Sequence, residues 1–258
     1  MADLRARVSG PALYLTLDRP AKRNALSPGM RQDLLDQLSF AASSPEVRVV
    51  VLRGAGGNFC SGGDVSTQGG ERTGVDSAER LLFSRRVIEA ITNLARPVIA
   101  AVEGYAVGAG FSLALACDIV VARQDARFSA IFTRRGLVPD MGCSYFLARQ
   151  VGLYRAKEIV LSGRMVEADE AARLGVVSHV WDEASFKDEL AELTSEIGSA
   201  PTVALATAKR ILNRTFESDL STVLELETLG QALASQTSDH QRGVDAFRAH
   251  ARPSFTGR

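Results

Sequence analysis

The sequence predicts an α/β protein that ends in an all-helical region, and three observations lead to this prediction. Apolar runs without polar alternation, at 47–52 and 97–102, are typical of strands buried on both faces of a sheet. Segments with helical periodicity lie between such runs. From Glu183 onward nearly every residue follows helical periodicity, with breaks at 199–201 and 218–219. Repeated strand–helix units favour a sheet covered by helices, followed here by a helical tail.

Size and charge limit the classes of function. A chain of 258 residues can bury a large core as one domain or as a domain with an appendage. Thirty basic and thirty acidic residues give no net charge, so we expect no nucleic-acid partner. No apolar run is long enough to span a bilayer and no signal peptide opens the chain, so we expect no membrane partner.

The cysteines and histidines argue against disulfides and metal sites. Three cysteines, in apolar or Gly-rich runs, predict a reducing compartment, a cytoplasmic location and no disulfide framework. The three histidines are scattered without metal-ligand spacing, so we expect no structural or catalytic metal.

The N-terminal quarter reads as a hairpin, a helix and a strand. Residues 4–8 and 12–17 alternate apolar with polar side chains around a Ser-Gly-Pro turn, which predicts a hairpin. A polar connection, 18–27, ends at Ser27, and Ser27-Pro28 predicts the N-cap of a helix that runs to about Ala42. The strand at 47–52 then leads into a Gly-rich turn that ends at Asp64.

The central part repeats the strand-to-glycine arrangement. Residues 68–75 predict a mobile surface loop, and 78–94 a helix with one apolar face. The strand at 97–102 leads into Gly104-Tyr-Ala-Val-Gly-Ala-Gly110, and 111–117 is apolar around its whole circumference, which is typical of a buried helix. The glycines can serve only a tight turn, or the free N–H groups behind them can hold an oxygen that becomes negative in a reaction.

The remaining elements are shorter. We expect a strand at 118–122, an ambiguous segment at 127–133, helices at 143–151, 154–162 and 168–174, and a strand at 176–181.

Two motifs together resemble a known family. Phe59-Cys-Ser-Gly-Gly-Asp64 and Gly104 to Gly110, followed by Cys117-Asp-Ile-Val, resemble the crotonase superfamily, also called the enoyl-CoA hydratase/isomerase family. The likeness extends from Arg19-Pro20 to the closing Phe255-Thr-Gly-Arg. It implies an α/β crotonase-like spiral of ββα units over residues 1–200, which holds an acyl-CoA thioester substrate. It implies that 201–258 form a helical trimerisation and lid region, in a homotrimer or hexamer, and that no cofactor is needed beyond the coenzyme A of the substrate.

The resemblance assigns the thioester oxygen to two backbone donors, the N–H groups of Gly63 and Ala109. An enolate forming at that oxygen needs preorganised donors that neither titrate nor rotate away. Asp64 is charged beside them, and we expect it to cap the next turn.

The acid–base residues discriminate among reactions. Hydratases of this family carry two glutamates, which would fall at Ser112 and Phe132 here. Hydration by that route is therefore not expected, because neither side chain replaces a carboxylate base. Asp140, in Gly136-Leu-Val-Pro-Asp140-Met-Gly, is similar in position to the single carboxylate of the ring-epoxide and enoyl-CoA isomerases of aromatic degradation. An N-cap of a helix from about Met141 is its alternative role.

Substrate contacts follow from the same resemblance. It places the following residues around the substrate: Arg23, Ala25, Ser61, Gly62, Asp64, Val65, Tyr105, Gly108, Phe132, Pro139, Phe247 and His250. His250 stands where relatives have a lysine, and Arg248 or Arg252 can substitute for it.

We therefore expect isomerisation of an enoyl-CoA double bond, with Asp140 as the proton carrier. The alternatives are a hydrolase or dehalogenase with Asp140 as nucleophile, a hydratase that takes a second carboxylate from Glu71, Asp76 or Glu79, and a non-catalytic acyl-CoA-binding member. An RNA-binding role is not expected because the four lysines are widely separated. Apolar stripes between 201 and 249 predict an interface between subunits.

Overall fold

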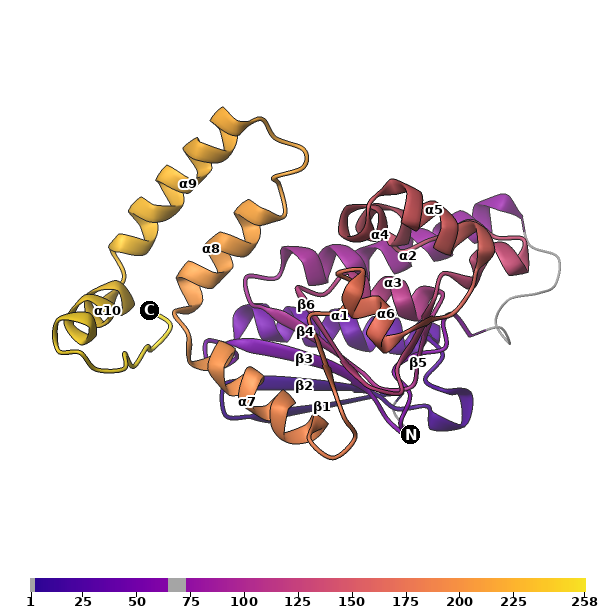
Figure 1. The fold of residues 1–258 in the computed structure, drawn as a ribbon, viewed down its shortest axis with the longest axis horizontal. Coiled ribbons are helices and arrows are strands. Elements are labelled where there is room, and N and C mark those ends of the chain that lie inside the picture. The colour runs from indigo at the N-terminus through magenta and orange to yellow at the C-terminus, as the bar shows by residue number, and fades with distance from the viewer. Residues whose placement is uncertain (1–2, 65–72) are drawn as a thin grey trace.

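The computed structural model describes residues 3–64 and 73–258, and its main sheet combines one hairpin with a run of parallel strands (Figure 1). The strand order is β1-β2-β3-β4-β6-β9. β1 (Leu4–Ser9) pairs antiparallel with β2 (Ala12–Leu17). The strands that continue the sheet in parallel are β3 (Val49–Gly54), β4 (Val98–Val102), β6 (Ile119–Arg123) and β9 (His179–Trp181). The predicted α/β class is confirmed.

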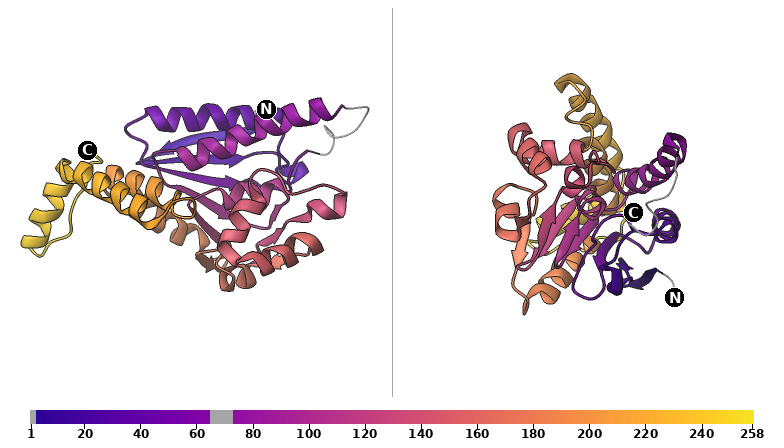
Figure 2. Two further views of the ribbon diagram at one scale, coloured as in Figure 1. Left: turned by 90° about the horizontal axis from the view of Figure 1, so that it is seen from above. Right: turned by 90° about the vertical axis from the view of Figure 1, so that its right-hand side faces the viewer.

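Both faces of this sheet are buried, which explains the unbroken apolar runs. Val50 and Leu52 face the larger core cluster, to which α1 (Pro28–Ser43) and α2 (Gly74–Asn93) contribute. Val49 and Val51 face a second cluster, completed by Phe186 and Leu190 of α7 (Phe186–Ser199). Successive side chains of a strand point to opposite faces, so an all-apolar strand fits only between two covering layers. Figure 2 shows these helices on the two sides of the sheet.

A second sheet carries the glycine-rich turns. It consists of β5 (Tyr105–Val107), β7 (Arg127–Ser129) and β8 (Val166–Glu167), with β5 parallel to β7 and β7 antiparallel to β8. An isolated bridge joins Cys60 to Ala106, and another joins Leu26 to Gly63. Both Gly-rich segments of the sequence therefore meet beside this sheet. The helices around it are α3 (Ala109–Leu115), α4 (Cys143–Val151), α5 (Leu153–Ser162), α6 (Ala168–Arg173) and the 3-10 turns η1 (Pro20–Lys22) and η3 (Ile131–Arg135).

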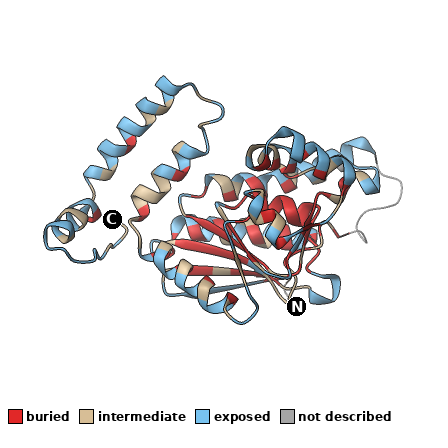
Figure 3. Cartoon of the chain, viewed as in Figure 1, coloured by how far each residue is buried: buried red, intermediate tan, exposed pale blue. Residues whose placement is uncertain are grey.

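The C-terminal helices form an arm that projects from this core (Figure 1). The arm contains α8 (Thr202–Leu212), α9 (Leu220–Ser235) and α10 (Ser238–Arg248). It is mostly exposed, in contrast to the buried strands (Figure 3). Lys209 and Arg48 fasten its base: the Lys209 ammonium lies 2.7 Å from the Asp118 carboxylate, and the Arg48 guanidinium donates to the Ala200 carbonyl at 2.6 Å.

Most predicted elements are present, and the differences have local causes. The hairpin, the helix from Pro28 and the buried helix around Leu113 are confirmed. The predicted loop at 68–75 lies partly outside the described residues, and its last part is wrong because Thr73 caps α2 and Val75 lies in that helix. The ambiguous segment at 127–133 divides into β7 and the start of η3. None of the helices in 3–64 and 73–258 is long and apolar enough to cross a membrane.

Candidate active site

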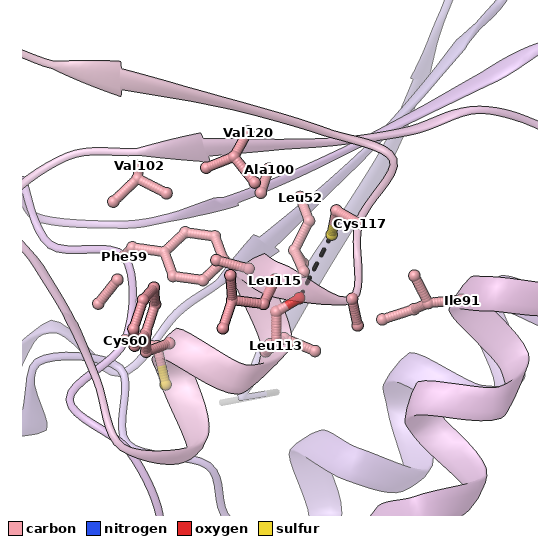
Figure 4. Close-up of a cluster of buried hydrophobic side chains, with 14 of the residues drawn as sticks. Leu52, Phe59, Cys60, Ile91, Ala100, Val102, Leu113, Leu115, Cys117 and Val120 are labelled. Carbon is pink, nitrogen blue, oxygen red and sulfur yellow. Dashed lines mark hydrogen bonds between the residues drawn. The ribbon is translucent and has the colours of Figure 1, made fainter. Parts of the chain in front are cut away.

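The core of the candidate site is α3, which is buried on all sides. Each of its seven residues is buried, as its uninterrupted apolar sequence predicts. Figure 4 shows Leu113 and Leu115 of this helix packed against Phe59 and Cys60, beneath Val102 and Val120 of the main sheet. Close packing fixes the position of α3 and of the turn before it.

The segment that ends at Asp64 lies directly against the first turn of α3. A Cβ added at Gly110 would lie 2.3 Å from the Cys60 carbonyl oxygen, so only glycine allows this approach. A Cβ added at Gly62 would lie 3.6 Å from the Ala109 amide nitrogen. The structure thus brings together the two backbone segments that the resemblance selects, from positions almost fifty residues apart.

The N–H groups of Gly63 and Ala109 are both unused within the described part of the chain. Leu26 N–H donates to the Gly62 carbonyl at 2.8 Å and Asp64 N–H donates to the Leu26 carbonyl at 3.2 Å, so the strand-like pairing leaves out the Gly63 N–H. Ala109 is the first residue of α3, where helical N–H groups have no partner within the helix. Two fixed, unused donors in neighbouring segments can hold one oxygen that gains negative charge.

Asp64 forms ion pairs with two basic side chains, and the turn that it is predicted to cap lies outside the described residues. Its carboxylate is buried and receives the Arg19 guanidinium at 2.7 Å and the Lys22 ammonium at 3.2 Å. Arg19 also donates to the Ala25 carbonyl at 2.8 Å. These opposite charges compensate the burial of the carboxylate, and the pairing fastens the segment 19–25 to the glycine-rich segment.

The predicted contacts near the N-terminus form one surface. Ser61 N–H donates to the Arg23 carbonyl at 2.9 Å, and the Arg23 guanidinium lies over the Tyr105 ring at 5.1 Å. Arg23 has a left-handed backbone conformation, as does Asn24, whose buried amide donates to the Asn58 carbonyl at 2.6 Å. The structure therefore gathers Arg23, Ala25, Ser61, Gly62 and Tyr105 in one place. Val65 lies outside the described residues.

Asp140 is not a helix cap. The N-cap of α4 is Gly142, without a side-chain hydrogen bond, and the backbone carbonyl of Asp140, not its carboxylate, accepts from Cys143 N–H at 3.1 Å. The Ser112 hydroxyl donates to that same carbonyl at 2.9 Å. Because Ser112 lies one turn after Ala109, this bond places Asp140 beside the start of α3. The capping alternative is excluded for its carboxylate.

The Asp140 carboxylate has the environment of a proton carrier. Its Oδ1 atom is buried and has no hydrogen-bond partner among the described residues. Burial raises the pKa of this carboxyl above its ordinary value, while the charges of Arg80 and Arg31 act in the opposite direction. A raised pKa brings a carboxylate closer to the range in which it both takes and returns a proton.

A cavity of about 1070 Å³ opens beside Asp140. It lies between α2, α4 and α8, and its apolar wall includes Leu81, Ile88, Met141 and Phe146. The acidic residues that line it are Asp140 and Glu89, and Glu89 is paired with Arg85 at 2.6 Å. The apolar part of this wall suits the acyl chain of a ligand, and the rest of the lining is polar or charged.

Phe132 and Pro139 lie near the same region. Phe132 is buried in the larger core cluster, and its ring would lie 4.0 Å from a Cβ added at Gly108. Pro139 is half-buried and directly precedes Asp140. Both positions are compatible with a wall of the site, although packing in the core also explains Phe132.

Phe247 and His250 are not brought to this site within one chain. Phe247 is 83% exposed at the end of α10, and His250 follows it in a left-handed conformation. Both lie on the arm, at the end of the molecule away from α3 and α4 (Figure 1). In the described part of the chain, no group of three or more His, Cys, Asp or Glu residues is arranged to hold a metal ion.

Sequence reasoning did not identify two arginines beside Asp140. Arg31 of α1 and Arg80 of α2 both interact electrostatically with its carboxylate. Arg31 is 3% exposed. The sequence does contain one signal of this burial: in the helical register of α1, Arg31 occupies a position at which an amphipathic helix normally has an apolar residue.

Comparisons of the sequence and the fold with known proteins all point to one family. A family model described as enoyl-CoA hydratase/isomerase matches residues 9–258. A probable enoyl-CoA hydratase of Rhodobacter capsulatus is 36% identical over 99% of this chain and 98% of its own length. The 1,2-epoxyphenylacetyl-CoA isomerase of Escherichia coli is 34% identical over the full length of both chains.

Among solved structures, an enoyl-CoA hydratase of Bacillus anthracis superposes with a TM-score of 0.95 at 29% identity. The match covers 99% of this chain and 100% of that one, so the crotonase-like fold is confirmed. With the family model matching almost the whole chain, this protein belongs to the enoyl-CoA hydratase/isomerase family of acyl-CoA enzymes.

Proposed function

We propose that the protein isomerises the double bond of an enoyl-CoA thioester, with Asp140 as the only acid–base group. The observation that carries this proposal is the Asp140 carboxylate itself: it borders a cavity with an apolar wall, its Oδ1 atom is buried without a partner among the described residues, and burial raises its pKa. Ser112 and Phe132 stand where family hydratases have carboxylates. One carboxylate is enough to move a proton, whereas activating a water by the family route takes two.

The proposed reaction moves one proton between two carbons. Asp140 removes a proton from C2 or C4 of the enoyl thioester and electrons shift toward the thioester oxygen. The N–H groups of Gly63 and Ala109 stabilise the resulting dienolate by donating to that oxygen. Asp140 then returns the proton at the other end of the conjugated system, and the double bond has changed place.

Replacement of Asp140 by asparagine tests the proposal. We expect Asp140→Asn to lower kcat for an enoyl-CoA isomerisation by at least about two orders of magnitude while the Kd of a saturated acyl-CoA stays nearly unchanged. Asp125→Asn is the matched control, since the Asp125 carboxylate is held by Arg123 outside the site. Full isomerase activity in Asp140→Asn would exclude this mechanism.

Hydration is the second candidate, because the names of several relatives include a hydratase. It needs a second carboxylate. Asp76 is engaged in a capping box with Thr73, Glu79 is exposed on α2, and Glu71 lies outside the described residues. Turnover in ¹⁸O water separates the candidates: label in the product supports hydration or hydrolysis, and unlabelled product with a moved double bond supports isomerisation. A covalent adduct on Asp140, seen by mass spectrometry, would instead support the nucleophilic hydrolase.

We further propose that residues 201–258 assemble the active enzyme as a trimer or hexamer. Four leucines of α9, Leu220, Leu224, Leu229 and Leu233, are each more than half exposed. A helix that is apolar on more than one side is normally buried. Phe247 and His250 lie far from Asp140 of their own chain. They would therefore contact coenzyme A only if the arm of one subunit reached the site of another.

A further inference from the structure

Arg31 takes a core position on α1. The residues that α1 buries include Arg31, Leu34, Leu38 and Ala41, which recur with helical spacing along one side. Arg31 is the N-terminal member of this stripe, about one turn after the Leu26–Gly63 bridge. At 3% exposure it is one of the most buried charged residues of the protein.

Arg80 takes the corresponding position on α2, which packs beside α1. Ser84, Val87 and Ile91 form a buried stripe on α2, and Arg80 continues that stripe by one turn toward the N-terminus of the helix. Its Nε atom is buried. Two neighbouring helices therefore each place a guanidinium at the end of an apolar stripe, near the same carboxylate, Asp140.

These two guanidinium groups lack the partners that other arginines of the protein have. Arg19 and Arg48 each donate to several carbonyl or carboxylate oxygens. Neither Arg31 nor Arg80 donates a side-chain hydrogen bond or forms an ion pair to any described residue, and the Nε atoms of both are buried. No ion pair within 4.0 Å joins either of them to Asp140.

Two arginines with buried Nε atoms and without hydrogen-bond partners among the described residues lower the stability of the folded protein when no ligand is bound. A buried guanidinium without an acceptor loses its hydration, and the negative charges of Asp140 and Asp64 offset only part of that loss for Arg31. Arginine stays protonated at neutral pH, so it does not escape the cost by losing its proton. Burial and then the like charge of Arg80 lower the pKa of Arg31, as expected for two positive groups that lie near each other. Residues that destabilise a fold in this way are typical of ligand sites.

We propose that Arg31 and Arg80 form an anion subsite that binds a carboxylate carried by the acyl group of the thioester, so that the preferred substrates are acyl-CoA esters of dicarboxylic acids. This inference rests on the proposed acyl-CoA reaction for the identity of the ligand. The planar guanidinium donates two parallel hydrogen bonds to a carboxylate. With Asp140 ionised the three groups carry one net positive charge, which one carboxylate neutralises. A coenzyme A phosphate, with a charge of about −2, would leave the three groups and the ligand with a net negative charge, so it matches the subsite less well than a carboxylate does.

Binding of saturated acyl-CoA pairs tests the subsite without any turnover. Each pair has the same number of acyl carbons and ends in a carboxylate or in a methyl group: succinyl- and butyryl-CoA, glutaryl- and pentanoyl-CoA, adipyl- and hexanoyl-CoA. By titration calorimetry we expect the wild-type protein to bind the carboxylate member of at least one pair about tenfold or more tightly. Arg31→Gln and Arg80→Gln should each remove most of that preference, with the Kd of the methyl-ended ester nearly unchanged.

Arg86→Gln is the matched control, because Arg86 lies on the same helix as Arg80 but is exposed, and it should keep the full preference. Arg31→Met should raise Tm while it removes the preference, since it replaces an unpaired buried charge by an apolar side chain of similar length. This variant covers the case in which the glutamine variant folds poorly.

Three outcomes would overturn the inference. In the first, the wild-type protein shows no preference in any pair. In the second, Arg31→Gln weakens the binding of both members of a pair and of free coenzyme A alike, which would assign Arg31 to the phosphates. In the third, the arginine variants change only the pH profile of turnover, which would limit both arginines to adjusting the pKa of Asp140. Failure of the isomerase proposal is measured separately, by the turnover of Asp140→Asn, and leaves these Kd values valid.

Discussion

The Ser112 hydroxyl donates a hydrogen bond of 2.9 Å to the backbone carbonyl of Asp140, and this bond joins the buried helix α3 to the residue that we propose as the proton carrier. Ser112 also lies 3.3 Å from the Gly108 carbonyl, within its own helix. Ser112 thus has a structural role: it holds the segment that carries the Asp140 carboxylate.

Loss of this bond should reduce turnover through misplacement of Asp140. We expect Ser112→Ala to lower kcat by about tenfold with little change in KM, because the catalytic group is less well positioned. The Asp140 carbonyl loses a donor, so the free energy of unfolding should fall by about 1–3 kcal/mol. Thr133→Ala is the control: it removes a 2.9 Å bond to the Val160 carbonyl and should cost stability without changing kcat. Equal losses of kcat in both variants would contradict the positioning role.

The raised pKa of Asp140 predicts how stability depends on pH. The folded protein binds a proton at Asp140 more readily than the unfolded chain, so this group lowers the stability as pH rises through the folded-state pKa. Asp140→Asn should therefore be more stable than the wild-type protein at neutral pH. Their difference in free energy of unfolding should shrink as pH falls toward the ordinary value of 3.8. Urea unfolding of both proteins, between neutral pH and about pH 3.8, measures this difference in the free energy of unfolding. A difference that does not depend on pH would contradict the raised pKa.

The approach of Gly110 to Cys60 should not tolerate a side chain. A Cβ there would lie 2.3 Å from the Cys60 carbonyl, so Gly110→Ala should separate the two segments that carry the proposed oxyanion donors. We expect a loss of about 1–3 kcal/mol in stability and a fall in kcat. Gly29→Ala provides the contrast, since Gly29 is exposed on α1 with its nearest atom at 3.9 Å, and it should stabilise the protein by up to about 1 kcal/mol. An active, unperturbed Gly110→Ala would exclude tight packing at this junction.

Lys209 should be necessary for the attachment of the arm. Its ammonium donates to the Ile91 and Arg96 carbonyls at 2.9 and 3.1 Å and pairs with Asp118 at 2.7 Å. Lys209→Met leaves the partly buried Asp118 carboxylate without its cation and should cost about 3 kcal/mol or more in chemical unfolding. Adding Asp118→Asn to that variant should recover part of the loss. Lys157→Met, at an exposed position, should change the free energy of unfolding very little. If it lowers stability as much as Lys209→Met does, the role of Lys209 in attaching the arm is refuted.

The exposed leucines of α9 should determine the oligomeric state. Light scattering should give a trimer or hexamer for the wild-type protein and a smaller mass for Leu224→Asp or Leu229→Asp, because a charge in an apolar interface is costly. Ser221→Asp adds the same charge to the same helix without removing a leucine and should keep the assembly. A monomer mass for the fully active wild-type protein would refute the proposal.

Local patterns in the sequence determined a large part of the fold. The apolar runs at 47–52 and 97–102 predicted strands between two layers, and 111–117 predicted a buried helix, and the structure has β3, β4 and α3 there with bounds shifted by a few residues. Ser27-Pro28 determined the start of α1 by its own hydrogen bond to Met30 N–H, which is a local contact. The paired motifs also determined the family, which the comparisons confirm.

The tertiary structure alone decided the features that depend on partners distant in sequence. β5 has three residues and exists because Arg127–Ser129 and Cys60 pair with it. Asp64 is an ion-pair partner of Arg19, forty-five residues away. Phe247 and His250 follow the direction of the arm and lie far from α3. The helical register of Arg31 places it among apolar residues of α1, but only the tertiary packing brings it near Asp140. Propensity and periodicity describe neighbours along the chain, whereas the charge environment of a site depends on what folding brings next to it.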